Sequence, residues 1–100
     1  MNIQEVKNED KITLEVEGRI DTNTSILLQE AVLKAFQKCK NVTVDLKEVS
    51  YVSSAGLRTF LIAHKTAESK GGVFELLSVS NDVMSVLDMS GFSKFLHINE

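Results

Sequence analysis

The spacing of apolar residues changes repeatedly along this chain, and the change limits the folds it can adopt. In residues 11–18 apolar and polar side chains alternate one by one, which is typical of a strand with one buried face. In residues 22–38 the apolar side chains recur every three or four positions, which indicates an amphipathic helix. The strand pattern returns at residues 42–47. Such switching predicts helices packed on a sheet.

The rest of the chain continues the alternation. A second helix should begin at Ser53 or Ser54 and end at Gly71-Gly72, because serine caps helix starts and glycine permits the left-handed turn at a helix end. Residues 73–79 then predict a strand, and residues 81–90 a short helix. Two weaker strand patterns lie near the ends, at residues 3–6 and 95–98.

This order of elements predicts an α/β fold. Parallel strands joined by helices need crossover connections, and an initial hairpin adds an antiparallel strand. We therefore expect a mixed sheet of four to five strands with the helices packed on one side. The length of 100 residues predicts a single domain over residues 1–100.

Composition narrows the class of function. The formal net charge is -3 and basic residues are not clustered, so neither nucleic acid nor an anionic membrane is an expected partner. Cys39 is alone, which predicts no internal disulfide and no multi-cysteine metal cluster. Apolar runs stay well below the roughly 20 residues of a membrane helix, and the first residues do not resemble a signal peptide. We expect a cytoplasmic protein.

The segment from residue 44 to residue 57 carries the strongest functional signal. A strand runs into a short connection, and Ser53, Ser54 and Gly56 open the next helix. Unpaired backbone N–H groups and the positive end of the helix dipole meet there, so a phosphate would be well accommodated. Gly56 should leave the backbone open to a kinase or phosphatase. From the residues alone, an ordinary helix cap and a phosphorylation site both remain open.

Three blocks of sequence carry a family resemblance when they are taken in order. They are Gly-Arg-Ile-Asp at residues 18–21, Asp-Leu at 45–46 with Val-Ser-Ser-Ala-Gly-Leu at 52–57, and Asp-Met-Ser-Gly-Phe at 88–92. Together they resemble the STAS family of bacterial anti-sigma factor antagonists, whose phosphorylation loop reads Asp-Ser-Ser/Thr-Gly-Leu. The likeness covers almost the whole chain.

The resemblance implies a switch between partners. Unphosphorylated chain would bind an anti-sigma factor with serine kinase activity, phosphorylation of Ser54 by that kinase would release it, and a metal-dependent serine phosphatase would reverse the change. The implied partner-binding residues are Asp21, Ser53, Ser54, Ala55, Gly56 and Leu57.

Two of these positions keep alternatives open. The family's aspartate before the phosphoacceptor is Ser53 here, so Ser53 could itself be modified. The same departure supports a second hypothesis, a non-switching STAS subunit of a transport or signalling complex. Asp21 could simply cap the first helix instead of facing a partner.

Catalytic chemistry has little support in the residues. Ser54, His64 and Asp45 are the residue types of a nucleophile triad. However, Ser54 lacks the Gly-x-Ser-x-Gly turn, and His64 lies ten residues further along the same helix. His97 has no partner at metal-ligand spacing. We expect no enzyme activity, no cofactor and no metal site.

Overall fold

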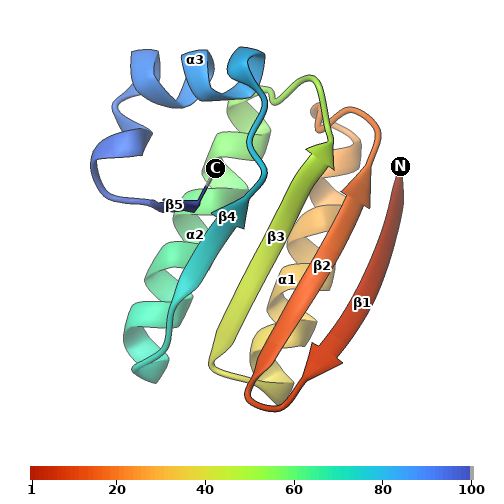
Figure 1. The fold of residues 1–100 in the computed structure, drawn as a ribbon, viewed down its shortest axis with the longest axis vertical. Helices are drawn as coiled ribbons and strands as arrows, with labels where there is room; N and C mark the ends of the chain where they lie inside the picture. Colours follow the sequence, from red (N-terminus) through yellow and green to blue (C-terminus); the bar gives the residue numbers. More distant parts are fainter. Residues whose placement is uncertain (100) are drawn as a thin grey trace.

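The computed structural model describes residues 1–99 and shows strands and helices in alternation after an initial hairpin (Figure 1). The predicted alternation is thereby confirmed. The elements are β1 (Asn2–Asn8), β2 (Lys11–Glu17), α1 (Thr24–Lys38), β3 (Asn41–Glu48), α2 (Ser54–Lys70), β4 (Phe74–Leu77), α3 (Asn81–Ser90), the 3-10 helix η1 (Phe92–Lys94) and β5 (His97–Asn99).

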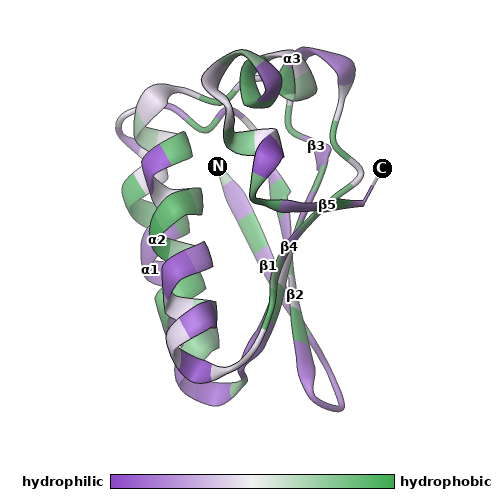
Figure 2. Ribbon diagram, turned by 90° about the vertical axis from the view of Figure 1, so that its left-hand side faces the viewer, coloured by the Kyte–Doolittle hydropathy of each residue, from purple (hydrophilic) through white to green (hydrophobic). Residues whose placement is uncertain are grey.

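The strands form one five-stranded sheet in the order β1-β2-β3-β4-β5. β1 pairs with β2 in antiparallel fashion, and all the other neighbours are parallel. The helices pack on one side, with α1 and α2 lying along the sheet and α3 near one end of it (Figures 1 and 2). This arrangement confirms the predicted α/β fold with a mixed sheet.

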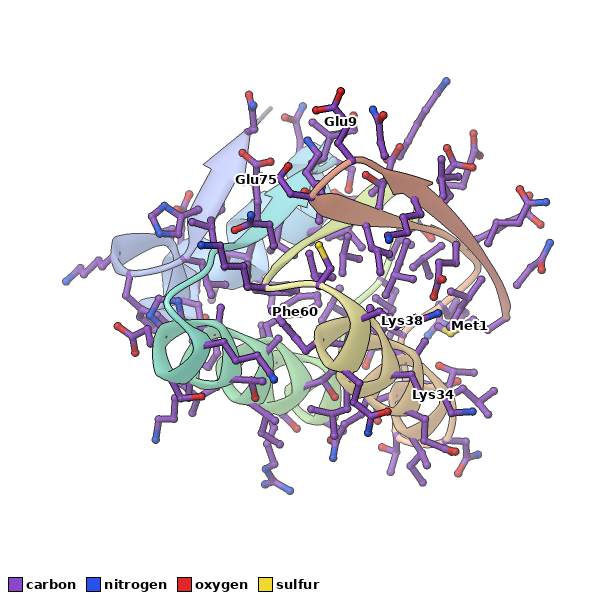
Figure 3. The ribbon with its side chains drawn as sticks, turned by 90° about the horizontal axis from the view of Figure 1, so that it is seen from below. Met1, Glu9, Lys34, Lys38, Phe60 and Glu75 are labelled. Carbon is purple, nitrogen blue, oxygen red and sulfur yellow. The ribbon has the colours of Figure 1, made fainter. Side chains whose placement is uncertain are left out.

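The strand β2 buries one face, as the one-by-one alternation predicts, whereas in β3 Thr43 on the opposite face is buried as well. In β2, the apolar side chains point toward the helices and are at most 3% exposed, whereas the polar side chains between them face the open side. Three phenylalanines join the layers, with ring centroids 6.2 and 6.4 Å apart; they are Phe36, Phe60 and Phe74. Figure 3 shows Phe60 between the helices and the sheet, and Lys38 between α1 and β1, where its Nζ pairs with Glu5.

Local signals set the ends of α2 and α3. Ser53 precedes α2, and its Oγ accepts a hydrogen bond from the backbone N–H three residues later, at 3.3 Å. Ser80 caps α3 in the same way at 3.2 Å. Gly71 (φ 70°) and Gly91 (φ 82°) end the two helices in the left-handed conformation. The predicted start and end of both helices are confirmed.

The C-terminal part differs from the prediction in detail. β4 stops at Leu77, two residues early, because Ser78 has φ 57° and turns the chain out of the sheet. The predicted strand at residues 95–98 begins later, at His97, because Phe95 and Leu96 lie in the turn that follows η1 and donate their N–H groups to the Phe92 carbonyl. Leu96, which is 7% exposed, anchors this segment in the core.

Candidate functional site

Two loops meet where β2 and β3 end (Figure 1). Ile20, in the loop before α1, and Val52, in the loop before α2, form an isolated parallel bridge. The Ile20 N–H donates to the Tyr51 carbonyl at 2.9 Å, and the Ser53 N–H donates to the Ile20 carbonyl at 2.8 Å. Since Ile20 and Val52 are both buried, the bridge is fixed by the core. It holds the segment containing Asp21 beside the start of α2.

The neighbouring serines at this start have different surroundings. Ser53 is half-buried and extended, and its Oγ is the cap that accepts the Gly56 N–H. Ser54 is the first residue of α2 and is exposed. Within residues 1–99, no hydrogen bond occupies the Ser54 hydroxyl. The geometry therefore leaves Ser54 accessible and commits Ser53 to the helix.

The electrostatic surroundings of Ser54 favour an anion. The first turn of α2 contains no acidic residue, and its backbone N–H groups are at the positive end of the helix. Arg58 is exposed and lies one turn further on, on the same helix face as Ser54. Arg19 lies over the Tyr51 ring, with Cζ 4.2 Å from the ring centroid. The motifs of the sequence did not point to either arginine, although the four-residue spacing from Ser54 was an available signal for Arg58.

Asp21 caps the first helix. Its Oδ1 accepts hydrogen bonds from the Thr24 N–H at 2.8 Å and the Asn23 N–H at 3.0 Å. The backbone and side-chain hydrogen bonds from Thr24 lower the pKa of Asp21, and the charge of Arg19 adds to this effect. Asp21 is therefore ionised at neutral pH. The capping role is confirmed, while the partner-facing role stays a prediction.

Gly56 has a different role from the one expected. It is buried, and a Cβ built on it would lie 2.7 Å from Cγ2 of Ile20 and 2.8 Å from Cγ1 of Val52. The expectation that its missing side chain lets a kinase approach the backbone is therefore wrong, because the protein's own core fills that space. Gly56 instead lets α2 lie close to the bridge. The adjacent Ala55 and Leu57 are half-buried, and Leu57 packs against the core.

The triad residues are not brought together by α2. Ten residues of helix separate Ser54 from His64 by a rise of about 15 Å. His64 packs against Phe95, with ring centroids 5.2 Å apart, and its Nε2 lies 3.6 Å from a carboxylate oxygen of Glu68. Within residues 1–99, no cluster of three or more His, Cys, Asp or Glu is placed to hold a metal ion. None of the helices in this range is long and apolar enough to cross a membrane.

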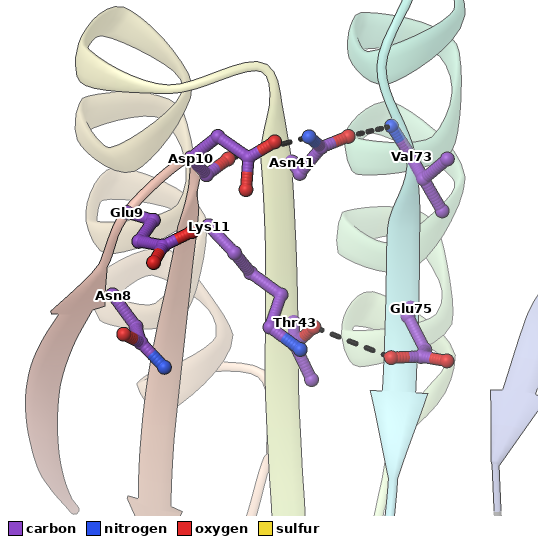
Figure 4. Close-up of a pocket in the computed structure, with 8 residues that line it drawn as sticks. All are labelled: Asn8, Glu9, Asp10, Lys11, Asn41, Thr43, Val73 and Glu75. Atoms are coloured by element: carbon purple, nitrogen blue, oxygen red, sulfur yellow. Dashed lines mark hydrogen bonds between the residues drawn. The ribbon is translucent and has the colours of Figure 1, made fainter.

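A hollow of about 530 Å³ lies at the other end of the strands, beside the β1–β2 turn (Figure 4). Its polar groups bond to one another. Asn41 donates to the Asp10 carbonyl at 3.3 Å and accepts from the Val73 N–H at 3.0 Å, and the Thr43 hydroxyl donates to Glu75 at 3.4 Å. Asn41 begins β3 whereas Ser54 follows its end, so this hollow is separate from the serine site.

Known proteins resemble the chain over most of its length. An anti-sigma-B factor antagonist of Bacillus subtilis is 26% identical over 99 residues, with 99% of this chain and 91% of the relative covered. An anti-sigma-B factor antagonist of Listeria monocytogenes is 32% identical over 103 residues, with 98% and 90% covered.

Solved structures share the fold. The anti-sigma factor antagonist SpoIIAA in its unphosphorylated form matches with a TM-score of 0.82 and 17% identity, over 97% of this chain and 87% of that one. The Bacillus cell fate determinant SpoIIAA in the phosphorylated form matches with a TM-score of 0.75 and 16% identity, over 97% and 90%. The sequence model of the STAS domain matches residues 2–100. The chain therefore belongs to the STAS domain family.

Proposed function

We propose that this chain is a cytoplasmic anti-sigma factor antagonist, not an enzyme, and that phosphorylation of Ser54 controls its binding to an anti-sigma factor. The observation that carries the proposal is the exposed Ser54 hydroxyl, free of hydrogen bonds within residues 1–99, at the positive end of α2. The neighbouring Ser53 hydroxyl is half-buried and used as a cap. Relatives named anti-sigma-B factor antagonist cover nearly the whole chain, which supports the class of partner.

The phosphoryl transfer would be carried out by the partner. Oγ of Ser54 attacks the γ-phosphorus of ATP bound to the anti-sigma factor, the bond to ADP breaks, and a base on the kinase takes the hydroxyl proton. A metal-dependent serine phosphatase would restore the hydroxyl by hydrolysis. In this scheme the chain supplies the nucleophile and is a substrate in both reactions.

The phosphate is expected to be stabilised in the free chain and to destabilise the complex. Phosphoserine carries a charge near -2. In the free chain, water, the first N–H groups of α2 and Arg58 stabilise this charge. In a complex that covers Ser54 the charge loses water and meets the partner surface, so the complex is destabilised. Asp21, Ser53, Ala55 and Leu57 would border this surface, with Gly56 behind it.

Incubation with a serine-kinase anti-sigma factor and Mg-ATP tests the proposal. Intact-mass and peptide mass spectrometry should find one phosphate, on Ser54. Ser54→Ala should take up none, whereas the matched variant Ser53→Ala should still be phosphorylated because it removes only the cap. A phosphate that moves to Ser53, or that is absent from the unsubstituted chain, would contradict this assignment.

The serine at position 53 favours a second candidate, a non-switching STAS subunit of a transport or signalling complex. The STAS family has an aspartate where this chain has Ser53, and recognition by the kinase could depend on that carboxylate. Restoring it discriminates the two functions. If Ser53→Asp is phosphorylated by the kinase while the unsubstituted chain is not, the non-switching candidate is favoured; equal phosphorylation of both favours the switch.

A further inference from the structure

β1 forms one edge of the sheet, and its outer side is unpaired within residues 1–99. All seven residues of β1 pair with β2 on the inner side, from Asn2 with Glu17 to Asn8 with Lys11. In an antiparallel pair, alternate residues turn their backbone N–H and C=O groups away from the partner strand. These groups lie along the free edge on the right of Figure 1 and can accept another strand.

The side chains of β1 restrict which strand can be added. Glu5 lies opposite Leu14 and Lys7 lies opposite Ile12, so both charged side chains are on the helix side of the sheet. Val6 is on the open side and is 46% exposed. Charges that point inward at an edge oppose the addition of a strand unless that strand brings opposite charges.

A second copy of β1 supplies the opposite charges when the two strands pair in one particular register. In a continuous sheet with twofold symmetry, the two antiparallel strands must be centred on a single residue. Centring on Val6 places Glu5 of each copy opposite Lys7 of the other copy, and the two Val6 side chains opposite each other. Centring on Glu5 or on Lys7 instead places like charges opposite each other, and centring on Gln4 places Glu5 opposite an apolar side chain. We propose that the chain forms a homodimer through β1 in the register centred on Val6.

The groove beside β1 has room for the added side chains. It has a volume of about 340 Å³, lies between β1 and α1, and includes Glu5 on one wall and Lys38 at its rim. Glu5 and Lys38 form an ion pair of 2.6 Å. Lys7 of the second copy, opposite Glu5, points to the same side, and its methylene groups cover apolar side chains of the groove. These apolar side chains are Ile3, Leu14, Leu27 and Ala31.

Self-association through β1 is independent of the proposed function. Ser54 opens α2, which packs beside α1 on the helix side, whereas the proposed contact adds to the free sheet edge (Figure 1). A homodimer therefore leaves the start of α2 accessible. Failure of the dimer would not affect phosphorylation at Ser54, and failure of phosphorylation would not affect the dimer.

Sedimentation equilibrium of charge variants tests the register. At protein concentrations up to about 1 mM, which a small interface requires, the chain should show a species of twice its 11.1 kDa mass. Lys7→Glu and Glu5→Lys each place like charges opposite each other, so each should weaken self-association at least about tenfold. An equal mixture of the two variants should form a heterodimer, because both cross-strand pairs are then opposite in charge. Lys65→Glu, an equal charge change on α2, should leave the dimer intact.

Hydrogen exchange gives a second measurement that does not depend on a variant. Amides of β1 should become more protected as the protein concentration rises, while exchange in α2 should not change. A chain that stays monomeric at about 1 mM contradicts the proposal. A dimer that Lys7→Glu leaves as tight as before, or β1 protection that is independent of concentration, shows that another surface is used and also contradicts it.

Discussion

At the scale of single residues, the site depends on which atoms of neighbouring residues face inward. Ser53 and Ser54 have the same side chain, yet one hydroxyl caps α2 and the other is exposed. The sequence predicts a helix start at this pair and, through the resemblance, the role of Ser54. It misplaces the role of Gly56, because the closeness of Ile20 and Val52 results from pairing between two loops distant in sequence.

Gly56→Ala should destabilise the fold although alanine is the better helix former. The added methyl group would lie within 2.8 Å of two buried side chains, and overpacking of this kind costs about 1–3 kcal/mol. Alanine recovers about 1 kcal/mol of helix propensity. Urea unfolding should therefore show a net loss of about 1 kcal/mol in the free energy of unfolding. A gain in stability would show that the space beside Gly56 is open.

Asp21→Asn should change the pH dependence of stability. The pKa of Asp21 is lowered in the folded chain by its hydrogen bonds from Thr24, so the ionised carboxylate stabilises the fold. This contribution is present above the unfolded pKa of about 3.9 and is lost as pH falls through the lower folded pKa. Asparagine remains a good cap but does not ionise. In urea titrations, the fall in stability below about pH 4 should be smaller for Asp21→Asn than for the unsubstituted chain. Parallel curves would contradict the assigned role.

At the scale of elements, the spacing of apolar residues alone locates most of the strands and helices. The alternating residues of β2 and β3 and the three-to-four spacing of α1 and α2 reflect one buried face per element, so the sequence predicts them well. The end of β4 and the short η1 were not predicted. A three-residue helix is too short to show a period, and the φ of 57° at Ser78 is not visible in the residue type.

Ser78→Gly should stabilise the chain. Ser78 has φ 57°, a left-handed conformation that disfavours residues with a Cβ by about 1 kcal/mol and that glycine adopts freely. Glycine also has more freedom in the unfolded chain, so the net gain should be about 0.5 kcal/mol. Thermal and urea unfolding can measure it, with Ser69→Gly in α2 as the control that should lose stability. A loss at Ser78 as large as the loss at Ser69 would show that its backbone conformation carries no strain.

At the scale of the whole molecule, the proposed binding site lies at one end of the sheet, where α2 begins. The predicted fold is confirmed, and the residues of two sequence blocks, 18–21 and 52–57, meet where β2 and β3 end. Parallel strands bring such ends to one edge, which the element order predicts. The pairing of Ile20 with Val52, and the contact of Arg19 with the Tyr51 ring, depend on tertiary packing that no local pattern encodes.

Binding of Ser54 variants to the anti-sigma factor tests the central claim most directly. Ser54→Ala removes an exposed hydroxyl without a hydrogen bond in residues 1–99, so it should bind as the unsubstituted chain does and stay bound with ATP. Ser54→Asp adds a charge that is favourable at the free helix start and unfavourable in the interface. Isothermal titration should find it at least about tenfold weaker, a loss of about 1.4 kcal/mol, with an unchanged thermal midpoint. Equal affinities of Ser54→Asp, the phosphorylated chain and the unsubstituted chain would contradict a charge-controlled interface at Ser54.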